Sequence, residues 1–150
     1  MDYKQVLNHL YSLKSSEIKL GLENIKNLLS KIGNPEKSLR CIHVGGTNGK
    51  CSVATMIFSV LRESGYKVGL YTSPHLKRFN ERIKVNDNSI TDKEIAAYYS
   101  KIKDNITNQS FFEITTAIAF LYFKDKKVDF VVLEVGLGGR LDATNVVKPL

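Results

Sequence analysis

The segment Ile42-His43-Val44-Gly45-Gly46-Thr47-Asn48-Gly49-Lys50-Cys51-Ser52 decides the fold class of this 150-residue chain. Apolar residues lead into a glycine-rich turn, and a helix-forming run follows Lys50. Glycines let successive backbone N–H groups turn toward one centre, and a helix N-terminus adds its positive end, so the segment suits phosphate groups. The lysine adds a point charge for the outer phosphates, and a nearby hydroxyl can reach magnesium. We therefore predict a phosphate-binding loop at residues 45–52.

This loop departs from the G-x-x-x-x-G-K-[ST] pattern at two places. Val44 stands where the first glycine is expected, and Cys51 follows the lysine, so the hydroxyl comes one residue later at Ser52. The strand, loop and helix together still favour phosphate binding over a purely structural turn. A second glycine loop at residues 136–141 has Leu141 in place of the third glycine and no helix after it, which argues against a dinucleotide site.

The pattern of apolar residues predicts an α/β domain with a P-loop-containing, mostly parallel sheet and flanking helices. Helical spacing predicts helices over residues 2–13, 20–32 and 50–64, the last with a buried face of Val53, Ile57, Val60 and Leu61. Capping boxes at Thr91 and Ser110 predict two more helices, the second reaching about residue 123. Short apolar runs predict strands over residues 39–44, 67–71, 83–85 and 128–135, the last buried in the sheet.

Composition excludes several classes of protein. Hydrophobic residues make up 43% and charged residues 25% of the chain, which is typical of a globular domain and not of a disordered one. No apolar run approaches the ~20 residues of a membrane span, and the N-terminus lacks a signal-peptide layout, so we expect a cytoplasmic protein. The two cysteines form no CxxC pair and predict reduced thiols. The net charge of +7 favours anionic ligands, but the lysines are too dispersed to predict nucleic-acid binding.

Glu134 ends the buried run that starts at Val128. A carboxylate at the carboxyl end of a buried strand is costly unless it is paired, and this edge of an α/β sheet is where ligands bind. Magnesium beside the phosphates would supply a partner. The alternative is an ion pair with Arg140 or with another cation.

Three long motifs, in order, resemble the folylpolyglutamate synthase/dihydrofolate synthase family of the Mur ligase superfamily. They are Gly46-Thr47-Asn48-Gly49-Lys50-Cys51-Ser52, the segment Tyr71-Thr72-Ser73-Pro74-His75-Leu76 with Phe79-Asn80-Glu81-Arg82-Ile83, and the run from Leu133 to Asn145. The family usually has glycine where Cys51 stands. The Ser-Pro-His-Leu loop separates this family from the muramyl-peptide ligases, which share the first motif.

The resemblance implies an ATP-dependent amide ligase. ATP would phosphorylate the carboxylate of dihydropteroate or a folate, and the amine of L-glutamate would displace phosphate from the acyl phosphate. Such chemistry needs alignment and charge neutralisation more than a side-chain nucleophile. The expected partners are these small molecules, with no nucleic acid and no membrane, and the expected state is a monomer.

The resemblance also assigns residues, each at its matching position. Gly46, Thr47, Asn48, Gly49, Lys50 and Ser52 would bind ATP, with Lys50 as the catalytic cation, and Ser73 and Glu134 would bind Mg²⁺. The substrate would contact Ile18, Lys19, Leu20, Ser110, Phe111, Phe112, Glu113, Leu141, Asp142 and Ala143. The family often has an acidic residue at Lys19. Simpler interpretations remain: Ser73 could only open the Pro74 turn, Phe112 could be core, and Ser110 with Glu113 could be only a helix cap.

The resemblance further implies that residues 1–150 are the amino-terminal part of the ATP-binding domain, a truncated Mur ligase central domain. The rest of that domain and a carboxy-terminal glutamate-binding domain would be absent, as would a histidine that completes the metal site. We therefore expect the chain alone to be inactive. The alternatives are an ATP-binding fragment without ligase activity and another Mur-type ligase.

Overall fold

A computed structural model describes residues 1–15 and 21–150. Its α-helices are α1 (Tyr3–Ser12), α2 (Glu23–Lys31), α3 (Lys50–Glu63), α4 (Asp92–Ile102) and α5 (Phe111–Asp125). Its strands are β1 (Cys41–Val44), β2 (Val68–Tyr71), β3 (Ile83–Val85), β4 (Asn88–Ser89) and β5 (Phe130–Glu134). Short 3₁₀ turns are η1 (Leu13–Ser15), η2 (Pro35–Ser38), η3 (Phe79–Arg82), η4 (Lys103–Asn105) and η5 (Ala143–Val146).

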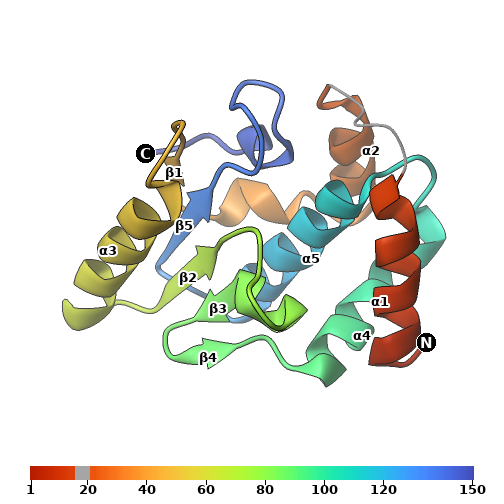
Figure 1. Ribbon diagram of the computed structural model, residues 1–150, viewed down its shortest axis with the longest axis horizontal. Helices are drawn as coiled ribbons and strands as arrows, with labels where there is room; N and C mark the ends of the chain where they lie inside the picture. The colour runs from red at the N-terminus through yellow and green to blue at the C-terminus, as the bar shows by residue number, and fades with distance from the viewer. Residues whose placement is uncertain (16–20) are drawn as a thin grey trace.

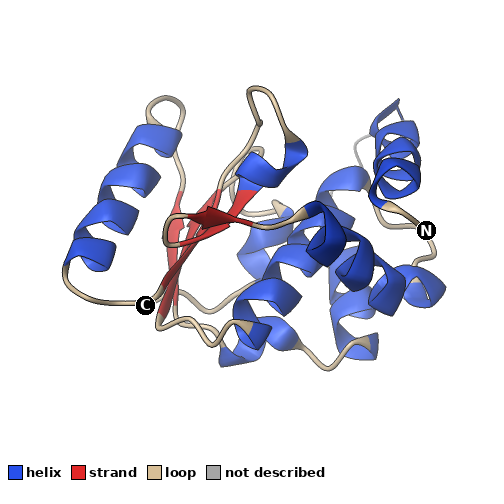
Figure 2. Ribbon diagram, turned by 90° about the horizontal axis from the view of Figure 1, so that it is seen from below, coloured by secondary structure: helices blue, strands red, loops and turns tan. Residues whose placement is uncertain are grey.

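The sheet is sandwiched between α3 on one face and α1, α2, α4 and α5 on the other (Figures 1 and 2). Each face has its own hydrophobic core. Side chains of β5 alternate between the two: Val131 and Leu133 join the core under the helix group, and Val132 packs with α3. Both faces of β5 are therefore covered, as its continuous apolar run predicted.

The strand order is β1-β5-β2-β3-β4. β5 pairs in parallel with β1 and β2, so the carboxyl ends of these three strands meet at one edge of the sheet. β3 pairs antiparallel with β2, and β4 pairs antiparallel with β3. The turn between β3 and β4 at Asn86, where φ is +49°, is too short for the crossover that a parallel pair needs. The predicted α/β class and buried central strand are confirmed, and the parallel part of the sheet is the part that carries the predicted site.

Local signals place the helix ends. Thr91 and Ser110 each form a complete capping box with the glutamate three residues later, as predicted. Gly33 follows α2 with φ of +86°, a conformation that glycine adopts without strain. None of the helices in residues 1–15 and 21–150 is long and apolar enough to cross a membrane.

The predicted buried face of α3 is wrong in part. Val53 and Val60 are 45% and 65% exposed, whereas Ala54 and Phe58 are buried against the sheet. Ile57 and Leu61 pack against this core as predicted. The helix is apolar around much of its circumference, so several apolar stripes fit the helical spacing. The stripe that faces the sheet is the one that buries the Phe58 ring.

Candidate functional site

The predicted phosphate loop connects β1 to α3. Gly46 and Gly49 have φ of +144° and +75°, which L-residues rarely adopt, so the loop needs glycine at both positions. Gly49 precedes α3 without any side-chain cap, which leaves the first N–H groups of the helix available to an anion. The Lys50 side chain approaches Gly46, with its Cγ 3.9 Å from where a Cβ would stand there. Thr47, Asn48 and Ser52 are exposed. The loop can therefore surround phosphate oxygens.

Glu134 and Ser73 lie beside this loop, at the carboxyl ends of β5 and β2. Glu134 is 4% exposed and pairs in register with Val44, which directly precedes the loop. Its Oε2 accepts a hydrogen bond of 3.0 Å from the Ser73 backbone N–H. In the described part of the chain Glu134 forms no ion pair, and Arg140 is exposed, so the alternative of a pair with Arg140 finds no support.

These two residues fit a hard cation such as Mg²⁺. A buried carboxylate without a cationic partner, next to a serine and a phosphate loop, is an oxygen donor set of the kind that Mg²⁺ prefers. Residues 1–15 and 21–150 contain no group of three or more His, Cys, Asp or Glu that could hold a metal ion. The oxygen donors that the described residues bring together beside the loop are thus those of Glu134 and Ser73.

A cavity of about 630 Å³ lies next to Ser73. It brings together residues that are far apart in the sequence, including predicted substrate residues from two segments. It is lined by Leu13, Lys14, Gly21, Ser73, Pro74, Arg82, Ser110, Phe111, Phe112, Glu113, Gly136, Leu137, Gly138, Gly139, Arg140, Leu141, Asp142 and Ala143. The predicted residues Ile18, Lys19 and Leu20 lie outside the described residues.

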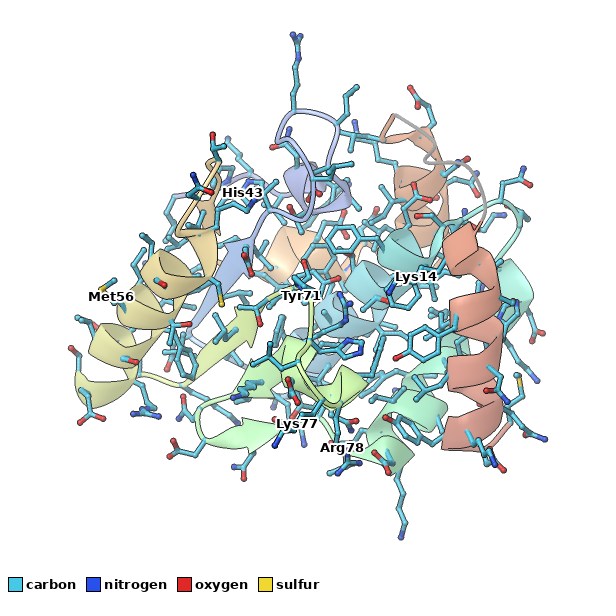
Figure 3. All side chains as sticks on the ribbon, in the orientation of Figure 1. Lys14, His43, Met56, Tyr71, Lys77 and Arg78 are labelled. Carbon is cyan, nitrogen blue, oxygen red and sulfur yellow. The ribbon has the colours of Figure 1, made fainter. Side chains whose placement is uncertain are left out.

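Two phenylalanines form the aromatic wall of this cavity. The Phe112 ring stacks on Tyr71, with ring centroids 5.8 Å apart, and the Phe111 ring stacks on Tyr11 at the same distance. Tyr71 lies near the centre of the molecule (Figure 3). Phe112 remains half-buried and borders the cavity, so it packs against Tyr71 and also presents apolar surface to the cavity.

Ser110 and Glu113 cap α5 at the same wall. The Ser110 Oγ accepts from the Glu113 N–H at 3.2 Å, and the Glu113 carboxylate accepts from the Ser110 N–H at 2.7 Å. The helix-cap interpretation therefore describes their hydrogen bonds, and both residues also border the cavity.

Asp142 organises the second glycine loop. Its Oδ1 accepts from the Gly136 and Leu137 N–H groups at 3.0 and 2.8 Å, and its Oδ2 accepts from the N–H and the hydroxyl of Thr144. The Thr144 hydroxyl in turn lies 2.6 Å from Nε2 of His43 on β1. Burial lowers the pKa of His43, so the neutral ring that donates to Thr144 is favoured. Asp142 thus ties the glycine loop to the strand before the phosphate loop.

Arg82 and Lys14 line the cavity but were not among the predicted site residues. Arg82 lies within the Phe79-Asn80-Glu81-Arg82-Ile83 motif, so the sequence contained a signal for it. Lys14, in η1, had no such signal, because only the fold brings it to the wall that Phe111 forms (Figure 3).

No protein-family model matches the chain. The dihydrofolate synthase/folylpolyglutamate synthase of Bacillus subtilis is 45% identical over 99% of this chain, which is 36% of that protein. The structure of folylpolyglutamate synthase from Thermotoga maritima matches with a TM-score of 0.91 at 50% identity, covering 98% of this chain and 36% of that one. A structure of E. coli FolC in complex with DHPP and ADP matches with a TM-score of 0.90 at 37% identity, covering 99% and 36%.

The chain therefore spans about a third of the length of each of these three relatives. Within that third, the alignments cover 98–99% of this chain at 45% and 50% identity. The resemblance drawn from the three motifs is confirmed: the chain is homologous to the folylpolyglutamate synthase/dihydrofolate synthases over the part of those proteins that it spans.

Proposed function

We propose that the chain is the nucleotide-binding and pterin-binding part of an ATP-dependent amide ligase that joins L-glutamate to dihydropteroate, to a folate, or to both. One observation carries the proposal. The phosphate loop, the Glu134–Ser73 pair and the aromatic cavity all lie at the edge where β1, β5 and β2 end. Two substrates can thus meet there, with an oxygen donor set beside their junction.

The proposed reaction has two steps. A carboxylate oxygen of the pterin acid takes the γ-phosphoryl group of ATP, and ADP leaves. The glutamate amine then attacks the acyl carbon, the bond from that carbon to the phosphate oxygen breaks, and phosphate leaves as the nitrogen loses a proton. Lys50 and the N–H groups of the loop hold the phosphates, and Phe111 and Phe112 orient the ring system. Mg²⁺ held by Glu134 and Ser73 would neutralise phosphate charge.

We further propose that residues 1–150 are the amino-terminal part of the ATP-binding domain of a longer cytoplasmic protein. The proposal is supported by the coverage of the relatives, by the incomplete metal site, and by an uncovered apolar stripe of Val53, Met56 and Val60 on α3.

Ligand binding and turnover together test the proposed function. The 150-residue chain should bind Mg·ATP and dihydropteroate but should not add labelled glutamate. A longer protein that contains these residues together with the proposed remainder should form the amide with dihydropteroate or tetrahydrofolate, with one ADP released per bond. If the chain binds neither ligand, the proposed function is contradicted. If the isolated chain adds glutamate, the proposal that turnover needs the remainder of a longer protein is contradicted.

A further inference from the structure

Arg82 is a buried cation without a carboxylate partner. The residue is 4% exposed, and in the described part of the chain none of its nitrogens contacts an acidic side chain. Its Nε donates to Nδ1 of His75 at 2.8 Å, which is the one side-chain hydrogen bond it forms there. Burying an uncompensated guanidinium is costly, because arginine stays charged under all ordinary conditions. Such a group indicates that a partner is supplied by a ligand.

The terminal nitrogens of this guanidinium have no side-chain partner in the described residues. Arg82 lines the cavity, and its Nη1 and Nη2 donate no hydrogen bond within residues 1–15 and 21–150. In those residues, the fully buried polar side-chain atom without a hydrogen-bond partner is Glu36 Oε2. Nη1 and Nη2 of Arg82 therefore keep some accessible surface. Five N–H donors in a planar fork match a carboxylate, and most of them are unused here.

The aromatic wall of the cavity holds the Arg82 guanidinium in place. The guanidinium carbon of Arg82 is 5.2 Å from the centroid of the Phe111 ring and 5.9 Å from that of Phe79. Lys14 Nζ lies 5.6 Å from the same Phe111 centroid. Two cations therefore flank one ring of the wall that would carry a flat ligand.

In the described part of the chain, the acids that line the cavity form no ion pair with these cations. Glu113 is engaged by the Ser110 N–H, and Asp142 by the glycine loop and Thr144. The three basic side chains that line the cavity, Lys14, Arg82 and Arg140, thus outnumber its two acids. The backbone also places Arg82 next to the reacting edge, because its carbonyl accepts from the Thr72 N–H, one residue before Ser73.

We propose that Arg82, with Lys14 as a second cation, binds the carboxylate of the pterin acid and holds it beside Ser73. This inference rests on the proposed function and adds the residue that distinguishes an acid from a neutral pterin. Arg82 acts as a binding residue: it pairs with the carboxylate while Phe111 and Phe112 hold the rings.

Two probes test the inference on the 150-residue chain: pteroate, and pteroic acid carboxamide, which has the same rings but no negative charge. Affinities are measured by equilibrium dialysis for the unsubstituted chain, Arg82→Gln, Arg82→Lys and Arg78→Gln. The Arg78→Gln control removes the same charge four residues away, where the guanidinium pairs with Asp92 outside the cavity. Thermal unfolding of each variant checks that it is folded.

The unsubstituted chain should prefer pteroate by about tenfold or more, the usual scale of a hydrogen-bonded charge pair. Arg82→Gln should abolish the preference by weakening pteroate alone, with the carboxamide affinity within about threefold. Arg82→Lys should lose most of the preference, because lysine cannot reproduce the fork, and it serves as the test if Arg82→Gln does not fold. Arg78→Gln should keep the preference.

Equal weakening of both probes, or an unchanged preference in the Arg82 variants, would overturn the role of Arg82 and leave the proposed function standing. Binding of neither probe by the folded, unsubstituted chain would overturn the proposed function and this inference with it.

Discussion

Cys41 and Cys51 differ in the two properties that govern thiol reactivity. Cys41 is buried on β1, and burial raises its pKa to about 12, so almost no thiolate forms at neutral pH. Cys51 is exposed in the first turn of α3, directly after Lys50. Because Cys51 stands within the predicted phosphate loop, its accessibility reports on the occupancy of that loop.

We predict that iodoacetamide at pH 8 modifies Cys51 at least about tenfold faster than Cys41, since the thiolate is the reactive form. Mg·ATP should slow modification of Cys51 by covering it. Peptide mass spectrometry after timed quenching measures both rates, and the Cys51→Ser variant identifies the slow site. Equal rates at the two cysteines would contradict the burial, and unchanged labelling with saturating Mg·ATP would contradict nucleotide binding at the loop.

At the scale of the element, the second glycine loop packs directly against the start of α5. Gly136 lies so close to the Phe112 ring that a Cβ there would stand 2.5 Å from a ring carbon, whereas a Cβ on Gly139 would meet nothing within 4 Å. The absence of a side chain at Gly136 therefore sets the position of the aromatic wall.

We predict that Gly136→Ala displaces Phe112 and lowers the free energy of unfolding by about 1–3 kcal/mol, the usual cost of overpacking. Pteroate binding should weaken together with stability. Gly139→Ala is the matched control, and urea unfolding with ligand titration measures both effects. A Gly136→Ala variant as stable as the Gly139→Ala variant would show that Phe112 is free to move aside.

Elements that depend on local chemistry could be predicted from the sequence. The capping boxes at Thr91 and Ser110 place the starts of α4 and α5, because side-chain and backbone groups three residues apart satisfy each other. The face of α3 could not be predicted, because its apolar residues fit several stripes and only the sheet decides between Val60 and Phe58.

The same contrast holds for the candidate site. The phosphate loop and Glu134 follow from a local motif and from the end of one strand. The cavity cations Arg82 and Lys14 come together only when residues 14, 82 and 111 meet in three dimensions. Asp142, predicted as a substrate residue, borders the cavity, and its carboxylate accepts from N–H groups that only the folded loop brings near.

At the scale of the whole molecule, the two faces of the sheet differ in cover. In the described residues, α1, α2, α4 and α5 lie on one face and α3 lies on the other (Figures 1 and 2). Met56 lies on the outer side of α3 (Figure 3) and is 61% exposed, whereas Phe58 is 5% exposed and packs in the core between α3 and the sheet. The exposed stripe thus contributes little to the stability of this chain.

We predict that Met56→Lys changes the free energy of unfolding by no more than about 0.5 kcal/mol, as for other surface substitutions. Phe58→Ala on the same helix should cost about 3–5 kcal/mol, because it leaves a cavity against the sheet. Chemical denaturation of both variants measures the difference. A large loss of stability in Met56→Lys would mean that the outer face of α3 is covered in the isolated chain.

The account depends most on nucleotide binding by the loop between β1 and α3. Calorimetric titration of the chain with Mg·AMPPNP tests it, using Lys50→Met and, as the control, Lys26→Met on α2, across the sheet from the loop. Lys50→Met should bind at least about tenfold more weakly, because hydrogen bonds to charged groups contribute roughly 1.5–3 kcal/mol, and Lys26→Met should bind like the unsubstituted chain. Equal binding by Lys50→Met and the unsubstituted chain, or no binding by either, would contradict it.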